Sequence, residues 1–378
     1  LCFHFSKMNF KDFCFQFMMR ILRSRILQVL IFITVIVSIY LFYQIANKST
    51  FTSETNNIRI KNNLDPISEK GNDGKNDRSD RRISENVNEI DVIVTFTKAE
   101  HNYALRDKFK VTVSSLLKHS TIDIKFHIIG DEPSQKIAKQ ILDETIKYVS
   151  VKHKLIHHDV DAMAKQLHEI VKPMQKYFSY KPGAYYSDAL FFLSIAIHRV
   201  LPDVQRVIML DADLKFRGNI KDLYMLFGEF AQDNVIGIAR EMQPVYRHLL
   251  NVYRNKHPNT RAGAPPPDGL TGFNSGVMLL DLDRMRQSEL YNSLINQDTL
   301  KEYTEKYTYK GHLGDQDFFS LINLEHEELF YVLPCTWNRQ LCTWWRENGY
   351  KNVFNQYFTC EGYINIYHGN CNTPIPDD

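Results

Sequence analysis

Two aspartates separated by one residue are the first side chains in this sequence whose spacing suggests chemistry. Asp211 and Asp213 directly follow a short apolar run, RVIML, at 206–210. Two carboxylates that leave one strand end can both reach one hard cation, and carboxylate oxygens suit Mg²⁺ and Mn²⁺. Such ions often join a protein to the diphosphate of a substrate. The alternative is a pair that only caps a turn or a helix, because aspartates are common at both positions.

A second group of acids lies in the segment GHLGDQDFF at 311–319. Asp315, Gln316 and Asp317 place two carboxylates and an amide at the start of an apolar helical pattern. Asp315 alone is explained as a helix N-cap. A cap does not require an amide between two acids, however, so all three are candidate catalytic residues.

His368 is the third candidate. It closes an alternating apolar run, INIYH at 364–368, and precedes Gly369, which lets the backbone approach a ligand closely. A lone histidine is more often structural than a ligand. A neutral imidazole beside two carboxylates would shift the metal preference from Mg²⁺ toward Mn²⁺. We therefore expect Asp211, Asp213 and His368 to hold Mn²⁺, with Mg²⁺ as the alternative.

These side chains need a scaffold that gathers strand ends at one edge. Apolar, β-rich runs alternate with helical patterns along the chain. Strands are predicted at 91–96, 122–129, 148–156, 206–210, 235–239, 273–280 and 363–367, and helices at 103–117, 133–148 and 186–200. This alternation predicts an α/β domain with an open, largely parallel sheet covered on both faces. Ligands of such sheets bind outside the carboxyl ends of the strands, so function is expected at 95–97 and from 211 onward.

The order of these motifs resembles the family 8 retaining glycosyltransferases. The shared features are a YYSD helix, Leu-Pro, a strand followed by Asp-x-Asp, the run FNSGVMLL, Asp-Gln-Asp and a terminal His-Gly. The resemblance covers 90–378 and implies the nucleotide-sugar-binding fold called GT-A, with a central, mainly parallel sheet. The runs IGIAREMQPVYRH (236–248), CTWNRQLCTWWR (335–346) and YHGNCNTPIP (367–376) are most similar to family members that transfer xylose.

The resemblance implies a reaction and its partners. The donor would be UDP-xylose, and xylose would pass with retention, in α1,3 linkage, onto xylose-α1,3-glucose O-linked to EGF-like repeats of Notch type. The closest alternatives are a glucoside xylosyltransferase and another UDP-sugar transferase of the family. A metal-dependent phosphoesterase is a further alternative, and it would differ from a transferase in that it does not bind UDP. A catalytically inactive, lectin-like scaffold is the non-enzyme alternative, and the intact metal-binding and Asp-Gln-Asp residues argue against it.

The resemblance also implies a role for individual residues. The metal ligands would be Asp211, Asp213 and His368; the donor contacts Thr95, Phe96, Thr97, Asp211, Ala212, Asp213, Ser275, Leu313 and Gln316; and the acceptor contacts His248, Trp344 and Asn370. An amide oxygen is a poor nucleophile, so we expect same-face attack, with Gln316 positioning the sugar. Many family members carry Lys-Pro-Trp after the terminal histidine, which neutralises the leaving diphosphate. Here that sequence is Asn-Thr-Pro-Ile-Pro, and the candidate replacements are Lys215, Arg217 and Arg346.

The N-terminal part of the chain predicts attachment to a membrane. Residues 26–46, ILQVLIFITVIVSIYLFYQIA, carry no charge and can span a hydrocarbon core of ~30 Å as a helix. Three arginines lie just before this run and a single lysine just after it, which places the N-terminus in the cytoplasm. A cleaved signal peptide is disfavoured by the length of the run and the lack of a small-x-small cleavage site.

The predicted order of segments follows from this anchor. A cytoplasmic tail at 1–25, a single type II signal anchor at 26–46 and a polar luminal stem at 47–89 precede the catalytic domain at 90–378. Such a stem buries too little apolar surface to fold by itself. The family resemblance suggests the endoplasmic reticulum membrane, with the Golgi as the alternative.

Cysteine usage agrees with a luminal domain. The four cysteines after the anchor all lie in the C-terminal part of the chain, at Cys335, Cys342, Cys360 and Cys371. They predict two disulfides, with three possible pairings. A zinc site is the alternative, but no Cys-x-x-Cys spacing supports it. The formal net charge of +2 gives no argument for a nucleic-acid partner.

Overall fold

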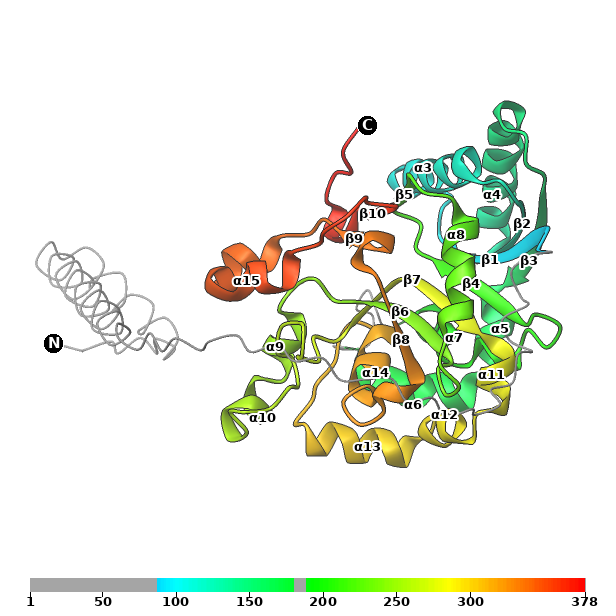
Figure 1. The fold of residues 1–378 in the computed structure, drawn as a ribbon. Helices are drawn as coiled ribbons and strands as arrows, with labels where there is room; N and C mark the ends of the chain where they lie inside the picture. Colours follow the sequence, from blue (N-terminus) through cyan, green and yellow to red (C-terminus); the bar gives the residue numbers. More distant parts are fainter. Residues whose placement is uncertain (1–86, 180–187, 378) are drawn as a thin grey trace, which may run out of the picture. The chain divides into compact units, whose positions relative to one another are not determined.

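The computed structural model describes residues 87–179 and 188–377 (Figure 1). They all belong to one compact unit of the chain, Asn76–Asp378. The predicted cytoplasmic tail, the anchor at 26–46 and nearly all of the stem lie outside the described residues. Within the described part, no helix combines the length and the apolar character needed to cross a membrane.

A seven-stranded sheet forms the centre of the domain, in the order β3-β2-β1-β4-β7-β6-β8. Its strands are β1 (Glu89–Thr95), β2 (Asp123–Gly130), β3 (His153–Asp159), β4 (Arg206–Leu210), β6 (Ile236–Arg240), β7 (Phe273–Asp281) and β8 (Phe330–Leu333). Six of them run in one direction, and β7 lies antiparallel to both of its neighbours, β4 and β6. The prediction of an open, largely parallel sheet is confirmed. It did not include the antiparallel direction of β7.

The reversal of β7 brings its first residues to the edge where β4 and β6 end. Leu210, the last residue of β4, pairs with Val277, and the Asp211 N–H donates to the Gly276 carbonyl oxygen at 2.9 Å. Arg240, the last residue of β6, pairs with Phe273. Segments that follow or precede three different strands therefore meet at this edge.

Helices cover both faces of the sheet, because alternate strand residues point to opposite faces and both faces are apolar. On one face, Val92 and Val94 of β1 join a core with α3 (Tyr103–His119) and α4 (Glu132–Thr145). On the other face, Ile93 joins a second core with α6 (His168–Phe178) and α14 (Asp315–Ile322) (Figure 1). The predicted two-sided cover is confirmed.

The helices are mostly short. The α-helices are α3 (Tyr103–His119), α4 (Glu132–Thr145), α5 (Val160–Gln166), α6 (His168–Phe178), α7 (Leu193–Ala196), α8 (Ile220–Met225), α9 (Val245–Leu249), α10 (Asn251–Lys256), α11 (Leu282–Gln287), α12 (Glu289–Leu294), α13 (Gln297–Lys306), α14 (Asp315–Ile322) and α15 (Lys351–Phe358). The helix predicted at 186–200 is described from residue 188, and there it forms successive turns at Ala189–Phe192, Leu193–Ala196 and Ile197–Arg199.

The weakest predicted strand, 148–156, is displaced toward the C-terminus. The observed strand β3 begins at His153 and lies at the sheet edge, where β2 is its one partner among the described strands. All seven of its residues are partly or fully exposed, and its sequence, HKLIHHD, is largely polar. Apolar periodicity therefore carries little information about where this edge strand begins.

A second, three-stranded sheet forms from segments that are distant in sequence. Strand β10 (Ile366–His368) lies between β5 (Leu214–Phe216), to which it is antiparallel, and β9 (Arg339–Gln340), to which it is parallel. The disulfides Cys335–Cys360 and Cys342–Cys371 cross-link this region. The two predicted disulfides are confirmed, and the strand predicted at 363–367 is shorter and belongs to this second sheet.

A buried ion pair fixes the end of β7 to the start of β4. Asp281 is 1% exposed, and its side chain accepts a hydrogen bond from Arg206 Nε at 2.8 Å. The same side chain accepts from the backbone N–H of Arg284 at 3.0 Å, so Asp281 is also the N-cap of α11. We expect Asp281→Ala in the purified full chain to lower the free energy of unfolding by about 3 kcal/mol, because it leaves a half-buried guanidinium unpaired and a helix uncapped.

Urea denaturation followed by circular dichroism measures this loss. The control is Asp283→Ala, which removes the 2.6 Å pair with Arg286 at a side chain that is 42% exposed. Exposed pairs contribute below about 1 kcal/mol, so the control should unfold almost as the unchanged chain does. Equal losses in the two variants would contradict the assignment.

Candidate active site

The small sheet places His368 beside the two aspartates that follow β4. Its partner in the β10–β5 register is Leu214, the residue after Asp213, and the Gly369 N–H donates to the Asp213 carbonyl oxygen at 2.9 Å. His368 Nε2 lies 3.3 Å from Asp213 Oδ1 and 3.5 Å from Asp211 Oδ2. The three predicted metal ligands are therefore brought together.

The donor set of this cluster fits one divalent cation. One ligand atom each from Asp211, Asp213 and His368 lies within 4.8 Å of the others. Two carboxylates and an imidazole are ligands that Mn²⁺ accepts, and Mg²⁺ accepts the carboxylates. The imidazole is 4% exposed but the Asp211 side chain is 56% exposed, so an ion held here would keep a side open to a substrate.

The electrostatics of the cluster follow from the closeness of these groups. Burial alone would raise the pKa of Asp213, but the hydrogen bond from His368 and the positive charges of His368 and Lys108 lower it to about 2. Burial alone would lower the pKa of His368, whereas the hydrogen bond and the negative charge of Asp213 raise it. A metal ion would replace the proton on the imidazole, so binding becomes weaker as the pH falls.

A glycine gives the imidazole its space. A Cβ added at Gly276 would lie 2.3 Å from His368 Cε1 and 3.1 Å from Asp211 Oδ2. Real Cβ atoms do not approach other atoms so closely, and the neighbouring imidazole is held in a sheet. The glycine of the run FNSGVMLL is thus required by the contact between β7 and His368.

The segment after β1 borders a cleft of about 480 Å³ that Thr97 and Asp131 line. Thr97 Oγ1 donates to Asp131 Oδ2 at 2.6 Å. Burial would raise the pKa of Asp131, but hydrogen bonds from Thr97, the Lys98 N–H and Ser134 hold it well below its usual range. Asp131 follows β2 as Thr97 follows β1, and the sequence gave no motif that singled it out.

The predicted residues at the end of β1 differ in what they expose. Thr95 is the last residue of β1, and its side chain is half-buried. Phe96 is fully buried and stacks on Phe109 with ring centroids 4.3 Å apart. Its ring therefore belongs to the core, and only its backbone can contact a ligand.

Comparisons with known proteins agree with this geometry. The model of the family described as glycosyl transferase family 8 matches residues 94–368. The chain is 52% identical to xyloside xylosyltransferase 1 of Mus musculus over 293 residues, which are 76% of this chain and 75% of that relative. The Homo sapiens protein of the same name is 51% identical over the same shares.

The chain belongs to glycosyl transferase family 8. The solved structure of mouse xyloside xylosyltransferase 1 in its apo form matches with a TM-score of 0.73 and 52% identity, covering 76% of this chain and 100% of that one. The bifunctional glycosyltransferase WbbM matches with a TM-score of 0.50 at 12% identity, covering 75% of this chain and 46% of that one, which shows the fold alone. The predicted family, the GT-A type of α/β fold and the enzyme class are confirmed.

The Asp-Gln-Asp residues of this family 8 domain have unlike surroundings. Asp315 Oδ1 accepts from Ser275 Oγ at 3.0 Å, and its other oxygen accepts from Ser194. Burial raises the pKa of Asp315 to about 7, against the hydrogen bonds from these serines. The N-cap of α14 is Gly314, with φ of 74°, so the interpretation of Asp315 as the cap is wrong.

Asp317 is completely buried and supports the loop before α14. Its Oδ1 accepts from Tyr309 at 2.7 Å and Tyr246 at 3.2 Å, and its Oδ2 accepts from the backbone N–H groups of His312 and Leu313, both at 2.6 Å. Both oxygens are therefore engaged within the protein. The structure gives Asp317 a structural contact set, whereas Leu313 lies half-buried in the loop that it holds.

The predicted acceptor residues fall into two groups. Trp344, 55% exposed, and His248 both contact the ring of Trp345, with centroids 4.9 and 4.8 Å apart. Asn370 Oδ1 accepts from the backbone N–H groups of Leu341 and Cys342 at 3.0 and 2.9 Å. Its oxygen thus holds the Cys342–Cys371 region together, which leaves only its amide nitrogen for a ligand.

Sequence reasoning missed a basic residue beside the cluster of Asp211, Asp213 and His368. Lys108 Nζ, from α3, lies 3.5 Å from Asp213 Oδ2 and 2.7 Å from Asn372 Oδ1. The three candidates named for this charge are engaged elsewhere: Lys215 donates to the Pro376 carbonyl oxygen, Arg217 lies over the rings of Tyr363 and Tyr367, and Arg346 lies over those of Phe354 and Phe358. No motif marks Lys108, because a lysine on a helix is usually solvated.

The glycine beside the imidazole generates a prediction. Gly276→Ala should weaken Mn²⁺ binding by at least about 10-fold, because the added methyl displaces His368 from the aspartates. Mn²⁺ affinity is measured on the full chain by electron paramagnetic resonance of the free ion.

The matched control is Gly237→Ala in the neighbouring strand β6. There the added methyl would lie 3.0 Å from Phe230 Cζ and 3.1 Å from Leu279 Cβ, in the core. It should lower stability and leave Mn²⁺ affinity unchanged. Unchanged binding in Gly276→Ala would remove His368 from the metal site.

Proposed function

We propose that this chain transfers xylose from UDP-xylose, with retention, in α1,3 linkage onto xylose-α1,3-glucose O-linked to EGF-like repeats. The observation that carries the proposal is the cluster of Asp211, Asp213 and His368 in a family 8 domain that is 52% identical to xyloside xylosyltransferase 1. The donor, the linkage and the acceptor come from that likeness, and the metal cluster supplies the chemistry that a UDP-sugar requires.

Three residues would hold Mn²⁺, with Mg²⁺ as the alternative, and others would hold the donor. Bound there, the ion would act as a Lewis acid on the diphosphate and stabilise the charge that develops on UDP. Thr95, Phe96 and Thr97 would contact the uridine, Phe96 through its backbone because its ring is buried. Ala212, Ser275 and Leu313 would line the xylose, and Ser275 is held by its hydrogen bond to Asp315.

Gln316 would position the transferred sugar and not attack it. Its side chain is 9% exposed and hydrogen-bonds Glu241, and a neutral amide oxygen is weakly nucleophilic. In same-face attack the acceptor hydroxyl oxygen forms a bond to the anomeric carbon as the bond to the UDP oxygen breaks. The proton of that hydroxyl passes to the departing phosphate, so no protein nucleophile is needed. Asp317 would act through the loop that it supports.

Lys108 would supply positive charge for the leaving diphosphate. The diphosphate must bind beside the acidic pair if one ion links the two, and the Lys108 ammonium already contacts Asp213. In many family members a lysine after the terminal histidine neutralises the leaving diphosphate. Here Lys108, which lies on α3, would neutralise it instead.

The acceptor and the membrane complete the proposal. The exposed Trp344, with His248 and the amide of Asn370, would contact the acceptor sugars or the EGF-like repeat, since indole faces suit sugars and partner side chains. Residues 26–46 would anchor the chain as a single-pass type II protein in the endoplasmic reticulum or Golgi membrane. Two disulfides in the domain are consistent with an oxidising lumen.

The proposed reaction is tested by incubating the purified full chain with UDP-xylose and an EGF-like repeat that carries xylosyl-glucose. We expect one added pentose by mass spectrometry, with Mn²⁺ present and not after chelation. A repeat that carries only glucose serves as the acceptor control, and UDP-glucose as the donor control. Transfer to the glucose-only repeat, or transfer unaffected by chelation, would contradict the proposal.

Substituting the missed lysine tests its role. Lys108→Met should lower kcat by about 100-fold, because one preorganised charge no longer faces the developing UDP charge. Mn²⁺ affinity should stay or rise, because a neighbouring positive charge repels the ion. The control Lys110→Met removes an exposed lysine from the same helix and should leave kcat unchanged. An unchanged kcat in Lys108→Met would assign the leaving-group charge elsewhere.

A further inference from the structure

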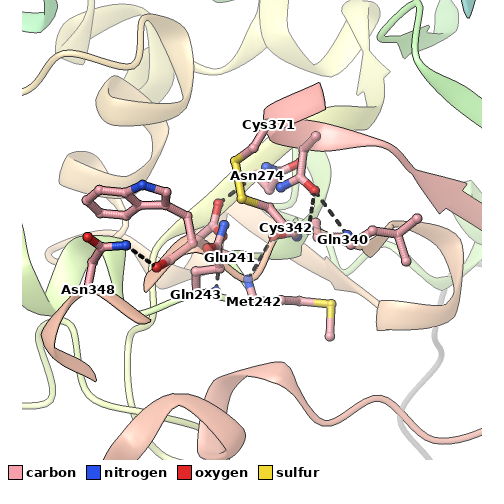
Figure 2. The surroundings of a disulfide bond; sticks show 11 residues. Glu241, Met242, Gln243, Asn274, Gln340, Cys342, Asn348 and Cys371 are labelled. Carbon is pink, nitrogen blue, oxygen red and sulfur yellow. Dashed lines mark hydrogen bonds between the residues drawn. A yellow bond between two sulfur atoms is a disulfide. The ribbon is translucent and has the colours of Figure 1, made fainter. Parts of the chain in front are cut away.

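A buried chain of polar side chains lies behind His368, on the side away from the aspartates. Asn338, Asn274 and Glu241 are 0%, 7% and 3% exposed. They come from the segment before β9, from β7 and from the residue after β6. Figure 2 shows Glu241 and Asn274 together with the hydrogen bonds near the Cys342–Cys371 disulfide. Burying a polar group without a hydrogen-bond partner destabilises the fold, so the partners of these side chains tell which of their atoms donate and which accept.

One backbone group fixes the donor and the acceptor of every hydrogen bond among Glu241, Asn274 and Asn338. The Gly276 N–H can only donate, and it donates to Asn274 Oδ1 at 3.2 Å. Asn274 therefore turns its Nδ2 toward Glu241 Oε2, at 3.3 Å. Asn338 faces two acceptors of Asn274, the side-chain Oδ1 at 2.9 Å and the backbone oxygen at 3.3 Å. The Asn338 atom that faces them must be Nδ2.

The same logic reaches the imidazole. With Nδ2 engaged by Asn274, Asn338 presents Oδ1 to His368 Nδ1, at 3.0 Å. An amide oxygen only accepts, so Nδ1 carries the hydrogen. In the neutral ring the lone pair is then on Nε2, the nitrogen that faces Asp211 and Asp213.

At the end of this hydrogen-bonded row opposite His368, Glu241 contacts Gln316. Glu241 accepts from the Gln243 N–H at 3.1 Å and also hydrogen-bonds the Gln316 side chain. Burial raises the pKa of Glu241 to about 7, and the bonds from Asn274 and Gln243 oppose that rise. One carboxylate is thus connected to Gln316 directly and to His368 through two amides.

We propose that Glu241, Asn274 and Asn338 form a positioning relay that fixes the tautomer of His368 for metal binding and, from the same carboxylate, orients Gln316 toward the donor sugar. Partners behind a metal-binding histidine commonly set its orientation and basicity. The relay rests on the metal site of the proposed function, and it adds residues that touch neither the ion nor the substrate.

The test of the relay measures Mn²⁺ alone, with no donor present. In the full chain, Asn338→Leu should weaken Mn²⁺ binding by about 10–100-fold by electron paramagnetic resonance, because Nδ1 of His368 loses its acceptor. Asn338→Asp keeps an oxygen acceptor for His368 Nδ1 but loses the donor to Asn274, so its Mn²⁺ affinity should lie between that of Asn338→Leu and that of the unchanged chain. A purely structural role for Asn338 would not give this rescue.

The matched control is Asn234→Leu. Asn234 is also a buried amide, but its Nδ2 donates to the Glu328 carbonyl oxygen and its Oδ1 accepts from the Ala231 N–H, and neither group belongs to the relay. It should lower the melting temperature about as much as Asn338→Leu does and keep Mn²⁺ affinity. Wild-type affinity in Asn338→Leu, or equal weakening in Asn338→Asp and Asn338→Leu, would overturn the relay.

Glu241→Gln tests the shared anchor. It keeps the shape but places a donor where the carboxylate accepted, so Mn²⁺ binding should weaken less than in Asn338→Leu while kcat falls at an unchanged KM for the donor. Unchanged Mn²⁺ affinity and kcat would remove Glu241 from the relay. If the unchanged chain binds Mn²⁺ but transfers no xylose, the proposed function fails while the relay stands. Wild-type Mn²⁺ affinity in Asn338→Leu overturns the relay alone.

Discussion

The pairing of β10 with β5 is the contact on which the site depends. It sets His368 opposite Leu214 and so beside Asp213, although the two segments are far apart in the chain. Three-residue strands have little stability of their own. Here they gain support from β9, from the bond between Gly369 and the Asp213 carbonyl oxygen, and from two disulfides. The C-terminal region of this domain is therefore part of the scaffold that makes a metal ligand set from two aspartates.

The candidate metal site is exposed on the side of the aspartates and buried on the side of Asn338. In front, Asp211 is exposed and Lys108 reaches Asp213, so charge can be added or removed as a substrate binds. Behind it, Asn338 and Gln340 are completely buried, and every bond of these amides goes to another protein group. A satisfied polar layer of this kind holds one arrangement, because any other arrangement leaves a buried group unpaired. Rigidity behind and access in front are what a site needs to grip an ion and exchange a nucleotide.

The sequence predicted which three side chains would cluster better than it predicted their surroundings. Asp211, Asp213 and His368 were identified from their position at strand ends, and the structure brings them together. The direction of β7 was not accessible, because an apolar run has the same pattern whichever way the strand lies. Gly314 as the cap of α14 was missed because a positive φ leaves no trace in residue type beyond glycine itself. Lys108 and Asp131 were missed because their partners lie on other elements, and only the register of the sheet and the packing of α3 reveal them.

The position of β10 in the sequence has a consequence for synthesis. The aspartates leave the ribosome well before the imidazole does, because more than a hundred residues separate Asp213 from His368. A growing polypeptide thus displays two acids that cannot yet retain a cation as the finished protein would. The three side chains of the candidate site can therefore come together only after β10 has been synthesised and has paired with β5.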